Sequence, residues 1–66
     1  MNGTVKRVVT DRGFGFIATD SGEEYFFHRD QLLSGLDFDT LRQGDRVTFE
    51  KQAGPKGPRA VAVQRA

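Results

Sequence analysis

The chain has 66 residues, of which 36% are hydrophobic, with one histidine, no cysteine and a net charge of +1. This length allows one domain over residues 1–66, the missing cysteines exclude disulfides and thiolate zinc sites, and one histidine is too few for an ordinary His-rich metal centre. Because no apolar run is long enough for a membrane span or a signal peptide, we expect a cytoplasmic protein that uses no membrane, metal or cofactor.

Eight glycines divide the chain into short segments, many of which alternate and are rich in β-branched or aromatic residues. Such segments predict strands joined by turns. Five strands are predicted, at Thr4–Val9, Gly13–Thr19, Glu24–His28, Arg46–Lys51 and Arg59–Gln64. The run Asp20–Gly22 predicts a tight turn between the second and third strands.

Two connecting segments are predicted to be irregular. Arg29–Gly44 has no strand pattern, although Asp30–Leu33 fits one helical turn. In Gly54–Pro58, two prolines are expected to block strand pairing on both sides, which predicts a loop. The chain therefore predicts an all-β fold with a long irregular connection between its third and fourth strands.

Alternation gives each predicted strand an inner and an outer face. The inner positions supply about the core that a small closed barrel holds. They are Val5, Ile17, Tyr25, Phe27, Leu41, Val47, Phe49, Val61 and Val63. Phe14 and Phe16 then lie opposite Ile17, on the outer face. Phe26 and His28 share that face, and the hairpin makes all four side chains neighbours.

An exposed cluster of three phenylalanines and one histidine suits the stacking of nucleobases, which all have a π-face. Basic residues lie nearby in the sequence, and they can hold phosphates. They are Lys6, Arg7, Arg12 and Arg29. Residues 51–66 add four basic residues and no acid, so the two ends of the chain can form one basic face. The pattern predicts binding of single strands with little sequence readout.

These residues resemble the cold-shock domain family. The stretch "RGFGFI" at 12–17, followed by "YFFH" at 25–28, is similar to the two nucleic-acid-binding motifs of that family. The resemblance extends over essentially the whole chain, through "GTVK" in the first strand, "LRQGDRVTFE" in the fourth and "GPKGPRAVAV" leading into the fifth. The order and spacing of the motifs make the match specific.

The resemblance implies a five-stranded antiparallel barrel of the oligonucleotide-binding type. It also implies low-specificity binding of single-stranded RNA and DNA, with a role as an RNA chaperone or a regulator of transcription or translation under cold or other stress. The family's contact positions fall on Lys6, Arg7, Phe14, Phe16, Phe26, His28, Arg29, Lys56 and Pro58, and on Phe38. Phe38 lies between Asp37 and Asp39, which repel phosphate.

The chain departs from the family pattern at two stacking positions. Arg7 stands where the family usually has Trp, and Arg29 stands where it usually has Phe; Val8 also replaces a common Phe. Arginine can stack on a base and also pair with a phosphate. We therefore expect fewer stacking rings, a larger electrostatic share of the affinity and a steeper salt dependence than in a Trp-bearing relative.

Other interpretations fit the sequence less well. The RNA-recognition motif has an aromatic run like "RGFGFI", but that fold needs two helices and an upstream partner motif. "HRD" at 28–30 lacks the rest of a kinase, and the glycines at 13 and 15 precede no helix, so we expect no enzyme. The alternative that remains is a protein-interaction module that uses the exposed aromatic patch. No small-molecule substrate is expected, and a monomer is favoured over a dimer.

Overall fold

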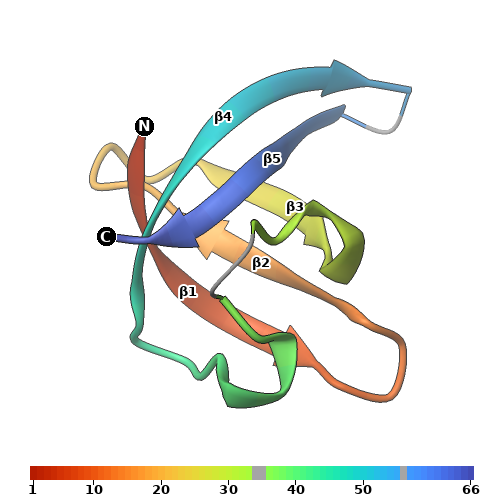
Figure 1. Ribbon diagram of the computed structural model, residues 1–66. Coiled ribbons are helices and arrows are strands. Elements are labelled where there is room, and N and C mark those ends of the chain that lie inside the picture. The colour runs from red at the N-terminus through yellow and green to blue at the C-terminus, as the bar shows by residue number, and fades with distance from the viewer. Residues whose placement is uncertain (34–35, 56) are drawn as a thin grey trace.

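The protein is described by a computed structural model that covers residues 1–33, 36–55 and 57–66. Its five strands form a closed barrel with the strand order β1-β2-β3-β5-β4 (Figure 1). The strands are β1 (Asn2–Val9), β2 (Phe14–Ala18), β3 (Glu24–His28), β4 (Arg46–Gly54) and β5 (Gly57–Arg65). The five predicted strands and the all-β barrel are confirmed.

One seam of the barrel differs from the prediction that all strands are antiparallel. Phe26 of β3 pairs with Arg59 of β5 in the parallel direction, whereas the other strand pairs are antiparallel. Closure explains the difference, because a ring of five strands cannot alternate direction at every contact. Strand direction alternates along the chain from β1 to β5, so β3 and β5, which are separated by one strand in the sequence, point the same way. β3 and β5 therefore meet as a parallel pair.

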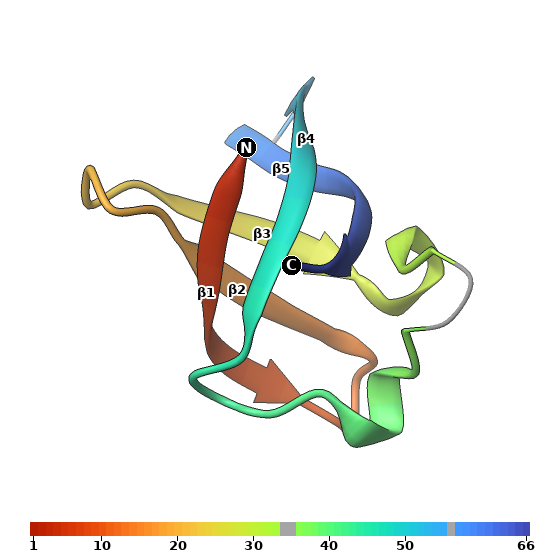
Figure 2. The ribbon, with the colours of Figure 1, turned by 60° about the vertical axis from the view of Figure 1, so that its left-hand side comes forward.

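The connection between β4 and β5 is shorter than predicted. Instead of a loop over Gly54–Pro58, the ladder continues outward, with Ala53 opposite Pro58 and Gly54 opposite Gly57. Figures 1 and 2 show this hairpin extending beyond the rest of the barrel. Pro58 is tolerated because this part of β5 has a paired strand on one side only, and strand edges accept proline.

The core fills the barrel interior, as alternation predicts, with one error. The buried hydrophobic side chains are Val5, Ile17, Tyr25, Phe27, Leu36, Phe38, Leu41, Val47, Phe49, Ala60 and Val63. Val61 was expected among them but is only half-buried, and Ala60 takes an inner position instead. The reason is Ala62, whose φ of 52° interrupts the extended backbone and breaks the two-residue period of β5.

The long connection between β3 and β4 contains two short 3-10 helices, η1 (Arg29–Gln31) and η2 (Phe38–Thr40). The predicted helical turn after β3 is confirmed, one residue earlier than expected, whereas η2 was not predicted. Asp37 begins η2 by accepting the backbone N–H of Asp39. Among the described residues, no helix is long and apolar enough to cross a membrane.

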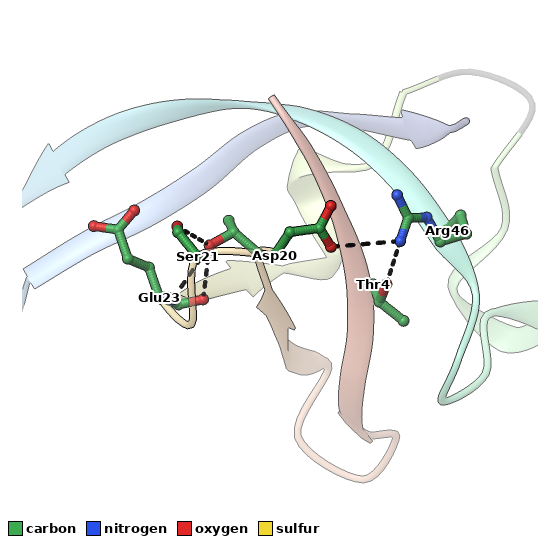
Figure 3. Close-up of polar contacts among 6 residues, drawn as sticks. Thr4, Asp20, Ser21, Glu23 and Arg46 are labelled. Carbon is green, nitrogen blue, oxygen red and sulfur yellow. Dashed lines mark hydrogen bonds and ion pairs between the residues drawn. The ribbon is translucent and has the colours of Figure 1, made fainter.

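Polar contacts join the β2–β3 turn to β4 (Figure 3). Thr19 Oγ1 accepts the backbone N–H of Glu23 at 3.2 Å, which closes the predicted tight turn. Arg46 donates to Thr4 Oγ1 at 3.1 Å and lies 3.7 Å from the Asp20 carboxylate. Arg46 and Asp20 are both exposed, so this pair contributes at most about 1 kcal/mol. The turn keeps β2 and β3 in register, and that register positions the aromatic side chains described next.

Candidate nucleic-acid interface

Three phenylalanine rings meet on the outer face of β2 and β3. Phe14 lies 5.9 Å from Phe16 and 5.3 Å from Phe26, and Phe16 lies 6.0 Å from Phe26, measured between ring centroids. Phe26 is 36% exposed, and the other two rings are half-buried. Their strand neighbours Ile17 and Phe27 point into the core. We call Phe14, Phe16, Phe26 and the adjacent His28 the aromatic cluster.

The hairpin register creates this cluster. Phe16 lies opposite Phe26 and Phe14 lies opposite His28 in the β2–β3 ladder, so two cross-strand pairs stand side by side. Directly opposed side chains in an antiparallel pair are close enough to touch. The core already contains eleven buried hydrophobic residues, none of them from the cluster. The cluster is therefore an apolar surface of its own rather than an extension of the core.

His28 is held in place at the end of the cluster by η1. Its Nδ1 accepts the backbone N–H of Asp30 at 3.2 Å. The Asp30 carboxylate lies 3.4 Å from the same nitrogen. The ring keeps its π-face free, and 46% of the side chain is exposed.

A bulge in β1 brings two basic residues to the same outer face. Val5 is opposite Ile17 and Arg7 is opposite Phe16, so Lys6 is one extra residue in the ladder. Both Lys6 and Arg7 are exposed as a result. Lys6 pairs with Glu24 of β3, whereas Arg7 forms no ion pair within the described ranges.

Arg29 follows His28 but extends away from the cluster. Its backbone N–H donates to the carbonyl of Gly13 at 2.9 Å, and its side chain crosses that glycine. A Cβ on Gly13 would lie 2.8 Å from Arg29 Cδ, and the φ of +74° also favours glycine there. The guanidinium lines a hollow with Asp37, Phe38 and Asp39. The structure thus places Arg29 between the cluster and η2.

Phe38 does not join the exposed rings. It is 8% exposed and packs edge-on against Phe27 in the core, with 6.4 Å between ring centroids. Phe38, Leu36 and Leu41 belong to the same buried hydrophobic cluster as Phe27. The structure therefore gives Phe38 a packing role, and its contact with a ligand stays a prediction.

The β4–β5 hairpin adds a second wall beside the cluster. A groove of about 490 Å³ lies between Phe16 and Phe26 on one side and Gly54–Pro55 and Gly57–Arg59 on the other. Pro58 is exposed in this wall, where the sequence resemblance implies a contact. Lys56, another implied contact, lies outside the described residues. The groove therefore connects the cluster with the hairpin.

Arg59 is the site residue that sequence reasoning missed. It pairs with Phe26 across the parallel seam and lines the hairpin groove, and its Cδ lies 3.3 Å from where a Cβ on Gly54 would stand. Like Arg7, it makes no ion pair with a described acid. The available signal was a basic residue directly after Pro58, but an all-antiparallel barrel gave no reason to place it beside Phe26.

Comparison with known proteins agrees with this geometry. Residues 1–66 match the model of the 'Cold-shock' DNA-binding domain. The chain is 41% identical to Cold shock protein 2 of Lactiplantibacillus plantarum, over 96% of this chain and 94% of that protein. It is 39% identical to the Major cold shock protein of Streptococcus pyogenes serotype M1, over 92% and 90%. It is 43% identical to Cold shock-like protein CspA of Shewanella violacea, over 92% and 87%. The barrel and the matches together make this chain a member of the cold-shock domain family, whose domains bind nucleic acids and are not enzymes.

Proposed function

We propose that the protein binds single-stranded RNA and DNA by stacking bases on the aromatic cluster. The observation that carries the proposal is the contact of Phe14, Phe16 and Phe26 with one another on the outer face, outside a complete core. Exposed rings in contact favour a ligand that presents flat apolar faces. Unpaired bases do so, and each stacked base contributes roughly 1–3 kcal/mol.

The cations around the cluster supply the second part of the affinity. Arg7 flanks Phe16, and Arg59 flanks Phe26. Both are free of ion pairs in the described structure, so neither must give up an acid before it meets a phosphate. Lys6 differs, because its pairing with Glu24 competes with a phosphate. Affinity should therefore fall with salt, and Lys6 should contribute less than Arg7.

The cellular role we propose is that of an RNA chaperone in the cytoplasm. Stacking on the cluster captures bases only when they are unpaired, so binding shifts RNA toward unstructured forms. Cold stabilises RNA structure, which makes such an activity useful at low temperature. The names of the relatives, all cold shock proteins, support a role in the cold-stress response.

A titration of single-site variants with a fluorescently labelled heptauridylate tests the stacking mechanism. Fluorescence anisotropy serves as the readout, because the chain has no tryptophan to quench. We expect Phe16→Ala to weaken binding about tenfold, in line with the loss of one stacked base. Phe16→Tyr should bind like the wild type, because it keeps the ring. Leu33→Ala, which truncates an exposed apolar side chain that is 41% exposed outside the cluster, is the matched control.

Two outcomes would count against the proposal. If Phe16→Ala is folded by circular dichroism and binds as tightly as the wild type, the cluster is not the stacking surface. If no single strand binds at low salt, the cluster serves another purpose, and docking of an apolar protein surface becomes the better explanation. A duplex of the same length should bind more weakly than the single strand, because its bases present no free faces.

A further inference from the structure

A second hollow adjoins the hairpin groove and shares Phe26 and Arg59 with it. It has a volume of about 260 Å³, and its lining residues come from β3, η1 and β5. Its lining residues are Phe26, His28, Asp30, Gln31, Arg59 and Ala60. The hollow therefore combines two stacking side chains of the aromatic cluster with several hydrogen-bonding groups. The hairpin groove contains only one charged group among its described lining residues, Arg59.

Asp30 and Arg59 are the charged groups of this hollow, and they do not pair with each other. No ion pair of the described structure joins them, although both line the same space. Within the described residues, the Asp30 carboxylate lies 3.4 Å from His28 Nδ1, and 77% of the Asp30 side chain is exposed, so the carboxylate is accessible to a ligand in the hollow. A carboxylate repels phosphate. On a surface that binds a nucleic-acid strand, it is therefore placed to accept hydrogen bonds from the N–H donors of a base edge.

Guanine is the base whose edge matches these two groups. It offers two adjacent donors, N1–H and N2–H₂, which a carboxylate can accept together. Next to them it offers two acceptors, O6 and N7, which the fork of an arginine can contact together. Adenine presents a donor where guanine has O6 and an acceptor where guanine has N1–H, so the carboxylate loses both of its donors and the arginine keeps only N7. Uracil, thymine and cytosine each lack the pair of adjacent donors.

We propose that this hollow is a guanine-selective subsite. Phe26 and His28 stack on the base, Asp30 accepts from N1–H and N2–H₂, and Arg59 donates to O6 and N7. The inference rests on the proposed single-strand binding and adds one selective position to a site that is otherwise tolerant of sequence. Gln31, which also lines the hollow, is a further amide at the rim.

The test is a set of labelled heptauridylates in which one uridine at each position in turn is replaced by guanosine, inosine or adenosine. Walking the substitution along the strand finds the position that occupies the hollow. At that position we expect guanosine to bind about tenfold more tightly than adenosine, as one good bidentate contact would give. Inosine, which lacks N2–H₂, should fall between them.

Two variants assign the preference to the hollow. Asp30→Asn should bring the affinities for guanosine and adenosine to within about twofold of each other. Arg59→Lys should reduce the preference because lysine keeps the charge but loses the fork. Asp39→Asn, the same change at an exposed aspartate outside the hollow, should leave the preference intact.

The outcomes separate this inference from the function on which it rests. If heptauridylate binds and guanosine shows no advantage at any position, the guanine subsite is wrong and single-strand binding stands. A guanosine preference that persists in Asp30→Asn also overturns the subsite. If no oligonucleotide binds at all, both proposals fail.

Discussion

Arg7 of β1 lies directly opposite Phe16 of β2 on the outer face of the barrel. This relationship depends on the bulge at Lys6, because strict alternation from the buried Val5 would turn Arg7 toward the core. The bulge instead places a guanidinium beside a half-buried ring. A guanidinium in that place can extend the stacking surface and also pair with a phosphate.

The first prediction concerns the charge of Arg7. Arg7→Gln should lower the slope of log affinity against log salt by about 0.7, the counterion contribution of one phosphate contact on a single strand. Anisotropy titrations at several salt concentrations measure the slope. Arg42→Gln removes an exposed arginine from the loop before β4 and should leave the slope unchanged. Equal slopes for Arg7→Gln and the wild type would show that Arg7 meets no phosphate.

The second prediction exchanges the charge for a ring at the same position. Arg7→Trp should reduce the salt dependence and bind more tightly than the wild type at high salt, where phosphate contacts are screened but stacking is not. At low salt the two proteins should differ less. The same titrations, extended to high salt, measure how the difference in affinity between the two proteins changes with salt. If the tryptophan variant showed the same slope as the wild type, the guanidinium would contribute no net electrostatic affinity.

The third prediction separates two phenylalanines that the family resemblance groups together. Phe38→Leu should lower the free energy of unfolding by about 1–2 kcal/mol, because the ring packs in the core against Phe27, and should change affinity by less than about twofold. Phe26→Leu should do the opposite, with a small loss of stability and a clear loss of affinity.

Urea denaturation and anisotropy, both at a temperature where each variant is folded, measure the two effects. A loss of affinity in folded Phe38→Leu that matches the loss in Phe26→Leu would return Phe38 to the binding surface.

Much of the fold follows from local sequence pattern. Alternation placed Tyr25 and Phe27 in the core and Phe26 and His28 outside it, and the structure agrees because the hairpin has no irregularity between these residues. The turn before β3 was also predictable from its residues. The outward direction of Phe14 and Phe16 followed from the same two-residue period.

The features that the sequence did not predict depend on closure of the barrel, and no local sequence pattern indicates them. The bulge at Lys6 and the break at Ala62 each shift a strand by one residue, and neither position has a glycine to signal it. The parallel contact of Phe26 with Arg59 arises only once five strands form a ring. For this reason the sequence could indicate the rings of the site but not the place of Arg59.

The fourth prediction uses the break in β5. Ala62 has a φ of 52°, a left-handed conformation that costs a non-glycine residue roughly 1–2 kcal/mol. Ala62→Gly removes this strain, whereas the added freedom of the unfolded chain costs about 0.5–1 kcal/mol. The variant should therefore be as stable as the wild type or more stable by up to about 1.5 kcal/mol, as measured by urea denaturation.

Ala60→Gly is the matched control for this prediction, because Ala60 is buried and extended two residues earlier in the same strand. It loses a buried methyl group and gains unfolded-state entropy, so it should be less stable by about 1–2 kcal/mol. The contrast in sign between the two alanines is the decisive result. If Ala62→Gly were destabilised as much as Ala60→Gly, the left-handed backbone at residue 62 would carry no strain.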